Sequence, residues 1–196
     1  MTSISMKSPA APAQTGVWVG IAAISMSFAA YTSALIVRQG ANPDWVHFKL
    51  PPILYFNTLV VLASSVTLYL APLKRRRRDS GLAELPAVGA RREVRLLYVT
   101  LGLGLLFLLG QVIAWRDVAA QGLTLASSPS SSFFYLLTAV HGVHLLGGLG
   151  GLLYVVYRVA RSSESQALRA YRAASVYWHF MAALWVYVFF LLAAQI

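Results

Sequence analysis

Five apolar stretches of roughly 20 residues dominate the sequence. A helix crosses the hydrocarbon core of a bilayer with about 20 mostly apolar residues. Gly, Pro and Ser residues separate neighbouring stretches, as expected for the turns between helices. The sequence therefore predicts an all-α fold, an integral membrane bundle of five transmembrane helices. We expect these helices to span residues 17–37, 52–73, 94–115, 132–157 and 173–194.

The composition excludes a soluble protein. Only 11% of the 196 residues are charged, whereas soluble domains carry roughly 25% charged residues. The mean hydropathy of +0.66 also excludes a disordered chain, since disorder requires low hydrophobicity. The chain has no cysteine, which excludes disulfides, thiolate metal sites and iron–sulfur clusters. The five spans leave room for a tail, residues 1–16, and one membrane domain, residues 17–196.

The basic residues are distributed unevenly between the two ends of the predicted bundle. The positive-inside rule places loops rich in Lys and Arg on the cytoplasmic side. On this basis we expect the amino terminus in the cytoplasm and the carboxyl terminus outside. Thirteen of the 16 basic residues then lie on the cytoplasmic side, and only Arg38, Lys49 and Arg116 lie opposite.

A run of basic residues follows the second span: Lys74, Arg75, Arg76, Arg77 and Arg78. Such runs also occur in nuclear-localisation signals and nucleic-acid patches. The position of this run, in a short loop at a helix end, favours a topology anchor that attracts anionic lipid headgroups. We therefore expect membrane lipids, and no nucleic acid, as its partner.

Carboxylates are absent from the middle of all five spans. Pumps and proton-coupled transporters usually keep buried carboxylates as proton relays. This chain is therefore poorly equipped to move protons or ions by itself. Its acidic residues all lie in loops or at span ends: Asp44, Asp79, Glu84, Glu93, Asp117 and Glu164.

The polar residues inside the spans are neutral, and the cost of burying such groups in lipid predicts that they face the bundle interior. The helical rise of about 1.5 Å per residue places His144 and His179 at ~18 and ~21 Å from the outer surface, so these two side chains are expected to be able to meet. His141 is expected on the same helix face as His144. The predicted structural polar network comprises Asn57, Thr58, Gln111, His141, His144, Trp178 and His179.

Three roles compete for the histidines. His144 and His179 facing each other would suit a haem b electron carrier, which needs a pair of histidines across helices. A metal site would rest on imidazole alone. Structural histidines bond across helices or to backbone carbonyls, and we favour this role. A small membrane transporter is a separate alternative, and it rests on the polar face of the second span: Asn57, Thr58, Ser64, Ser65 and Thr67.

Glycines concentrate in the fourth span. Gly147 and Gly151 form a small-xxx-small pair, which is typical of two helices in close contact. We expect the fourth span to pack tightly against a neighbour at this pair.

Aromatic residues gather near the predicted cytoplasmic ends of the last two spans. Tyr154, Tyr157, Tyr177 and Trp178 lie there. Aromatic rings at this depth commonly form an interfacial belt, and we expect this position for all four.

Four strings stand in a particular order along the chain. They read NTLVVLASS at 57–65, GQVIAW at 110–115, FFYLLTAVHGVHLLGG at 133–148 and YWHFMAALW at 177–185. Their order and spacing resemble the haem–copper (cytochrome c) oxidase subunit III family, in its short five-helix bacterial form. The last two strings are similar to the family's Thr-Gly-x-His-Gly-x-His and Tyr-Trp-His-Phe-Val-Asp-x-x-Trp motifs. The resemblance extends from about Gly16 to the end of the chain.

The resemblance implies a non-catalytic, accessory subunit of a respiratory terminal oxidase in the bacterial cytoplasmic membrane. In that family the subunit packs on the catalytic subunit I, holds lipids in a cleft and supports proton delivery. The implied partners are subunit I, other oxidase subunits and a larger respiratory supercomplex. The resemblance implies no active site and no cofactor in this chain, with haem and copper in partner subunits and phospholipid bound to it. The family's histidines at the positions of His141, His144 and His179 are not redox-centre ligands.

The departures from the family pattern fall mainly on acidic positions. The family's first-span glutamate aligns near Ile24, and the glutamate of its third-span string aligns with Ala114. The final-helix aspartate aligns with Ala182, and the glycine of the Thr-Gly pair with Ala139. These replacements argue against a proton-uptake role and leave a structural, lipid-binding role as the expectation.

Overall fold

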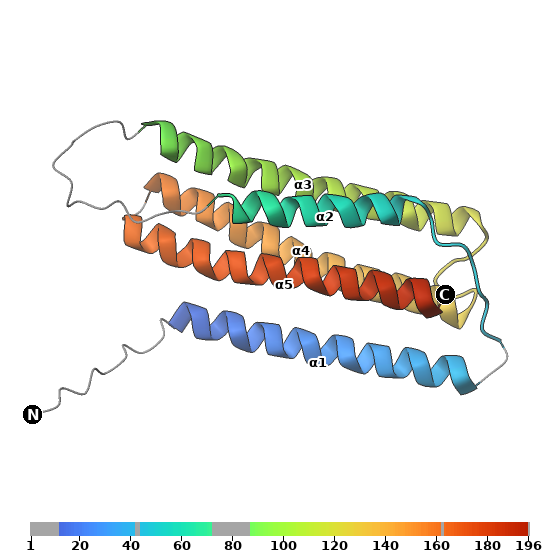
Figure 1. The fold of residues 1–196 in the computed structure, drawn as a ribbon. Helices are drawn as coiled ribbons and strands as arrows, with labels where there is room; N and C mark the ends of the chain where they lie inside the picture. The colour runs from blue at the N-terminus through green and yellow to red at the C-terminus, as the bar shows by residue number, and fades with distance from the viewer. Residues whose placement is uncertain (1–11, 42–43, 72–86, 162, 196) are drawn as a thin grey trace, which may run out of the picture.

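The structure is a computed structural model that describes residues 12–41, 44–71, 87–161 and 163–195. The described residues are almost entirely α-helical and contain no strand, which confirms the all-α fold. Helices follow one another in antiparallel order along the bundle (Figure 1). Their bounds are α1 Pro12–Ala41, α2 Ile53–Tyr69, α3 Ala87–Ala120, α4 Pro129–Arg161 and α5 Glu164–Gln195.

Helices α2, α3, α4 and α5 form a closed four-helix bundle. Each packs against two neighbours, in the order α2, α3, α4, α5 and back to α2. Rings from opposite helices meet in the centre, where Phe107 of α3 lies edge-to-face on Trp185 of α5 with 4.7 Å between ring centroids. The core of this bundle contains the polar residues that the sequence predicts to face inward.

Helix α1 lies outside this bundle (Figure 1). It packs on α5 and α4 and contacts neither α2 nor α3 within the described residues. Its buried side chains form one narrow stripe, because Ile21, Ile24, Phe28 and Leu35 are spaced to fall on one helix face. Most of the other α1 residues are exposed or half-buried, as expected for a helix surrounded mostly by lipid.

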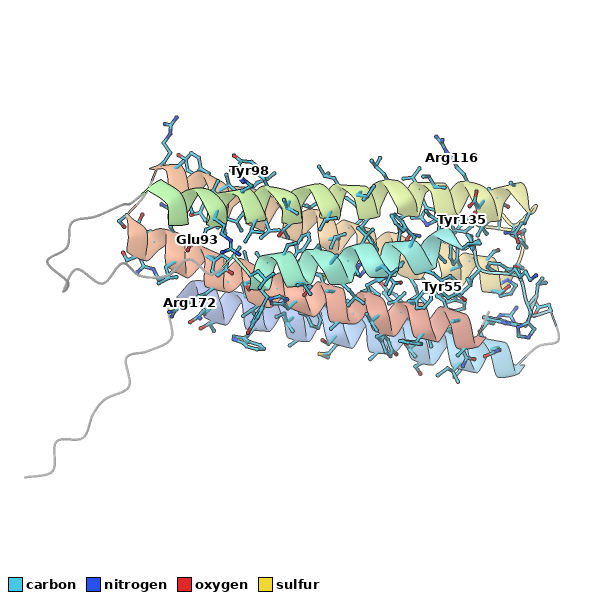
Figure 2. All side chains as sticks on the ribbon, turned by 45° about the horizontal axis from the view of Figure 1, so that its top comes forward. Tyr55, Glu93, Tyr98, Arg116, Tyr135 and Arg172 are labelled. Atoms are coloured by element: carbon cyan, nitrogen blue, oxygen red, sulfur yellow. The ribbon has the colours of Figure 1, made fainter. Side chains whose placement is uncertain are left out.

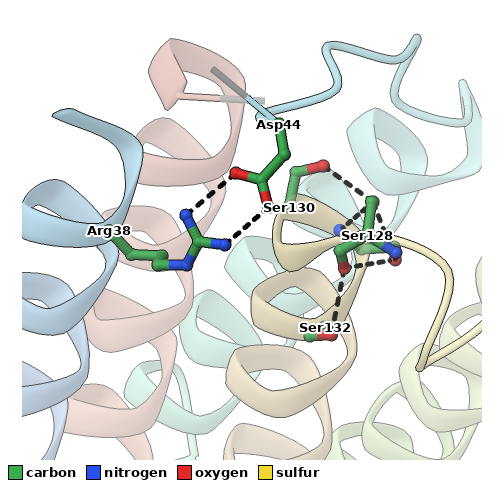
Figure 3. Close-up of polar contacts among 6 residues, drawn as sticks. Arg38, Asp44, Ser128, Ser130 and Ser132 are labelled. Carbon is green, nitrogen blue, oxygen red and sulfur yellow. Dashed lines mark hydrogen bonds and ion pairs between the residues drawn. The ribbon is translucent and has the colours of Figure 1, made fainter. Parts of the chain in front are cut away.

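Serine side chains build the start of α4 (Figure 3). The backbone N–H of Ser131 donates to Ser128 Oγ at 3.2 Å, and the backbone N–H of Ser128 donates to Ser131 Oγ at 3.3 Å. This reciprocal pairing satisfies free N–H groups at the helix start, as a capping box does. Ser130 Oγ donates to the carbonyl of Val46 at 2.7 Å. The α1–α2 connection is thereby attached to the start of α4.

An ion pair follows the end of α1 (Figure 3). Arg38 donates from its two terminal nitrogens to the two carboxylate oxygens of Asp44, at 2.9 and 2.7 Å. Trp45 Nε1 donates to the carbonyl of Gln195 at 2.9 Å. These contacts hold the segment after α1 against the end of α5.

The observed helix bounds differ from the predicted spans. Helices α1, α3, α4 and α5 are longer than predicted at both ends and are each long and apolar enough to cross a membrane. The second span is shorter than predicted, because α2 ends at Tyr69 rather than at residue 73 and contains 17 residues. Its last turn closes with N–H donation from Leu70 to Val66 and from Ala71 to Leu68. Pro72, next in the sequence, lacks the N–H that a longer helix needs.

The first helix begins at one end of the bundle, and the last helix finishes at the other (Figure 1). Arg172 lies at the end where α3 begins, and Arg116 lies at the opposite end (Figure 2). Helix α1 begins at the first of these ends and α5 finishes at the other (Figure 1). An odd number of spans therefore separates the two termini. Which end faces the cytoplasm stays a prediction.

Candidate functional site

Trp178 on α5 contacts all three other helices of the four-helix bundle. Its Nε1 donates to Ser64 Oγ on α2 at 3.1 Å. A Cβ atom on Gly104 of α3 would lie 2.7 Å from Trp178 Cη2, and one on Gly148 of α4 would lie 3.2 Å from its Cε3. The indole is 1% exposed. The prediction that Trp178 joins an interfacial belt is wrong, because two glycines open enough space to bury the whole ring.

The predicted glycine pair lies beside α5, with less crowding than the sequence indicates. A Cβ atom on Gly147 would lie 3.8 Å from Tyr177 Oη, and one on Gly151 would lie 3.9 Å from Ala174 Cβ. Both are ordinary contact distances. The close approach is found one residue away, at Gly148, because that residue faces the Trp178 ring.

Asn57 on α2 lies against the backbone of α3. Its Nδ2 donates to the carbonyl of Phe107 at 3.4 Å. A Cβ atom on Gly110 would overlap Asn57 Oδ1. Asn57 is fully buried, and its Oδ1 has no hydrogen-bond partner within the described chain. The side chain thus fills the space left by Gly110 and keeps a free acceptor.

His141 on α4 is enclosed by aromatic rings. Its ring centroid lies 5.8 Å from that of Phe107 and 5.1 Å from that of Trp185. The side chain is 0% exposed. Neither ring nitrogen has a partner among the residues that the structure describes.

Gln111 on α3 lies one turn beyond Phe107 and is 2% exposed. Contacts between α3 and α4 occur one turn before it and one turn after it. Phe107 faces His141 before it, and Trp115 Nε1 donates to Thr138 Oγ1 at 2.9 Å after it. Gln111 therefore lies at the depth of His141, and both of its amide atoms lack a partner in the described part of the chain.

The structure does not bring His144 and His179 together. His144 Nδ1 lies 2.7 Å from the carbonyl of Val140, and its ring meets Phe28 of α1 at 6.3 Å. His179 Nδ1 lies 2.5 Å from Ser65 Oγ on α2. The expectation that these histidines meet is wrong, because two side chains at the same depth in the membrane can point toward different helices. The proposed haem b pair is therefore not formed.

His141 and His144 also face different neighbours. His141 points into the four-helix bundle, whereas His144 points to α1. Residues three apart on a helix differ by about 60° in direction, since each residue turns the helix by about 100°. No group of three or more His, Cys, Asp or Glu residues that could hold a metal occurs in the described ranges.

The polar face of α2 is engaged with its neighbours. Thr58 Oγ1 accepts from Trp185 Nε1 at 3.0 Å. Thr67 Oγ1 lies 2.9 Å from Thr100 Oγ1 on α3. These pairs, together with Ser64 and Ser65, connect α2 to α3 and α5. The face that suggested a transporter is thus used for helix–helix contact.

The predicted topology anchors, Lys74 to Arg78, lie outside the described residues.

The sequence predictions do not include Gly104 and Gly110 as packing positions. A lone glycine in a membrane helix does not reveal which neighbouring helix it faces. Gly104 lies seven residues before Gln111, and that spacing on one buried face was the available clue.

Comparison with known proteins identifies the family. The model of the family "Cytochrome c oxidase subunit III" matches residues 25–194. The chain belongs to this family. A probable cytochrome c oxidase subunit 3 of Mycobacterium tuberculosis is 32% identical over 170 residues, which cover 83% of this chain and 75% of the relative.

Two further relatives are also named cytochrome c oxidase subunit 3. Cytochrome c oxidase subunit 3 of Corynebacterium diphtheriae is 30% identical over 154 residues, covering 78% of this chain and 70% of the relative. That of Thermostichus vulcanus is 25% identical over 185 residues, covering 90% and 84%. The apolar helices and these bacterial relatives identify an oxidase subunit III that crosses the bacterial cytoplasmic membrane several times. Such a subunit associates with other oxidase subunits.

Within this subunit III, the positions that depart from the family's acidic pattern are buried. Ile24 is 8% exposed, Ala114 is 0% exposed and Ala182 is 3% exposed. All three lie in the hydrophobic core. Apolar packing therefore occupies the places at which the sequence resemblance expects carboxylates.

Proposed function

We propose that this subunit is a structural, non-catalytic scaffold that packs on the catalytic subunit of the oxidase and takes no part in proton uptake. The burial of Ile24, Ala114 and Ala182 carries the proposal. A proton relay through the membrane needs groups that bind and release protons. Apolar side chains at these positions supply none, whereas they do add to helix packing.

Depletion of the subunit tests this proposal. The oxidase is purified through a tag on this chain, and the haem- and copper-bearing subunits are expected to copurify. The subunit is then removed with mild detergent. We expect the initial turnover and its pH dependence to stay unchanged, while the active lifetime during turnover falls several-fold. A shift in the pH profile of initial turnover would contradict the scaffold role, as would purification of the chain without oxidase partners.

We propose that phospholipid binds on α5 between α1 and α2. These two helices both pack on α5 but not on each other within the described residues. Tyr187 of α5 faces α1 through Thr32, at 2.8 Å, and Phe189 faces α2 through Tyr55, at 5.1 Å between rings. Phe190 lies on the strip between these contacts and is 65% exposed. An acyl chain fits the chemistry of this apolar strip.

Lipid analysis tests this site. Ala183 lies seven residues before Phe190 on the same strip and is exposed. We expect Ala183→Trp to reduce the phospholipid retained by the purified complex, measured by mass spectrometry. Leu109→Trp, at an exposed position of α3, is the matched control and should retain the normal amount. Equal retention by both variants would contradict the site.

We propose that the amino terminus is cytoplasmic and the carboxyl terminus external. Arg92 and Arg172 lie at the end of the bundle that begins α3, as do the basic residues at the end of α4. The chain contains no cysteine, so single cysteines report orientation cleanly. In inside-out vesicles, a membrane-impermeant maleimide should label Ser163→Cys and spare Ala126→Cys. The opposite labelling would reverse the orientation.

A further inference from the structure

Three buried polar side chains lie near Phe107 inside the four-helix bundle. Asn57 comes from α2, Gln111 from α3 and His141 from α4. Each is 2% exposed or less. We call these residues the polar triad.

Phe107 relates the members of the polar triad to one another. Its carbonyl accepts from Asn57 Nδ2, and its ring lies 5.8 Å from that of His141. Gln111 follows one helical turn later, next to the Gly110 on which Asn57 lies. Two members of the triad thus contact Phe107, and the third lies one helical turn from it.

The polar triad is almost entirely without hydrogen-bond partners in the described chain. Five of its six side-chain nitrogen and oxygen atoms are unpaired: Asn57 Oδ1, both amide atoms of Gln111 and both ring nitrogens of His141. Elsewhere in the same core, Ser64, Thr100 and Thr138 all have partners. Buried polar atoms in proteins are nearly always paired, either with protein or with ordered water.

We propose that the polar triad binds at least one ordered water molecule within the membrane-spanning bundle. Water both donates and accepts hydrogen bonds, and a buried water typically makes about three. The triad offers matching groups, because Asn57 Oδ1 accepts, the Gln111 amide does both, and a neutral imidazole has one donor and one acceptor. The water thus links α2, α3 and α4 through their side chains.

The chemistry of the polar triad favours a neutral ligand over an ion. Its members carry amide and imidazole groups, and the rings of Phe107 and Trp185 enclose the site. The sequence places no Asp, Glu, Lys or Arg between positions 96 and 115 of α3 or between 132 and 157 of α4. An ion in this environment would lack a counter-charge, which makes its burial costly. Water meets the hydrogen-bonding demand without that penalty.

Cryo-electron microscopy of the purified oxidase containing this subunit tests the proposal. A map that resolves ordered waters should show separate density within hydrogen-bonding distance of at least two triad side chains. Direct hydrogen bonds among Asn57, Gln111 and His141, with no density between them, would overturn the proposal. This observation needs no variant, so a folding defect cannot obscure it.

A pair of variants on α3 sharpens the test. Gln111→Met removes the amide at similar volume, and the density is expected to be lost or reduced to background. Thr100→Val removes a buried hydroxyl that already has partners, Thr67 on α2 and the carbonyl of Leu96 on α3, and it should leave the density unchanged. Retention of the full density in Gln111→Met would show that the amide does not hold the water, and would overturn the assignment to the triad.

Discussion

Asn57 Oδ1 lies where a Cβ atom on Gly110 would be, so α2 and α3 meet through the bare backbone of Gly110. The Asn57 amide group reaches the carbonyl of Phe107 only because no side chain intervenes. A hydrogen bond to helix backbone in the core of the bundle therefore depends on one glycine.

Replacement of Gly110 by alanine is expected to destabilise the subunit. The added methyl group must displace Asn57, and overpacking of a dense core typically costs about 1–3 kcal/mol. An SDS titration of the purified oxidase in mixed micelles, with unfolding followed by a probe on this subunit, measures the loss. Gly102→Ala on the same helix is the control, because no heavy atom lies within 4 Å of the added Cβ. Equal stability of the two variants would contradict the role of Gly110.

Gly104 and Trp178 are expected to be energetically coupled. Gly104→Ala should destabilise the bundle, since the new Cβ would lie 2.7 Å from Trp178 Cη2. Trp178→Phe removes that atom but also removes the hydrogen bond to Ser64. The double variant should therefore be less destabilised than the sum of the single variants, by about 1 kcal/mol. Simple additivity in the same SDS titration would argue against direct contact.

Helix α1 is expected to loosen before the rest of the subunit. It packs through a narrow stripe, in which Phe28 is 1% exposed and touches His144 of α4. Phe28→Ala should increase the mobility of a nitroxide attached at Ser33→Cys, measured by electron paramagnetic resonance. A nitroxide at Leu105→Cys on α3 should show no change. Equal increases at both sites would indicate general unfolding instead.

The Arg38–Asp44 ion pair predicts a pH dependence. The guanidinium of Arg38 lowers the pKa of Asp44 by hydrogen bonding, and this effect exceeds the opposing effect of desolvation. The pair therefore stabilises the folded chain above the ordinary carboxyl pKa of about 4, and the stabilisation is lost as pH falls through the lowered value. The wild type should have a higher Tm than Asp44→Asn at pH 7. The difference should shrink as pH falls below the ordinary carboxyl value and disappear once Asp44 is protonated, and high salt should reduce it.

The helices could be predicted from the sequence because their cause is local. A stretch of apolar residues long enough to cross the membrane must satisfy its own backbone hydrogen bonds, whatever its neighbours. Local chemistry also identifies the start of α4 at Ser127–Ser132. The early end of α2 also had a local signal, since Pro72 cannot donate a backbone N–H. The predicted second span nevertheless continues past Pro72 to residue 73.

The helix toward which each histidine side chain points could not be predicted from the local sequence. Depth follows from residue count, and His144 and His179 were expected to meet on that basis. Facing depends on which helices are neighbours, and only the arrangement of five helices decides it. In the structure His144 faces α1 and His179 faces α2, on different sides of α5.

The sequence by itself determined the membrane environment, the helical fold and the family, because apolar length, charge placement and motif order are properties of the chain. The tertiary structure alone decided that Trp178 is buried between Gly104 and Gly148, and that Asn57 and His141 are buried next to Phe107, one turn from the buried Gln111. These features join residues from different helices. Their geometry arises only when the helices pack, since a side chain's partner is set by the rotation of both helices about their axes.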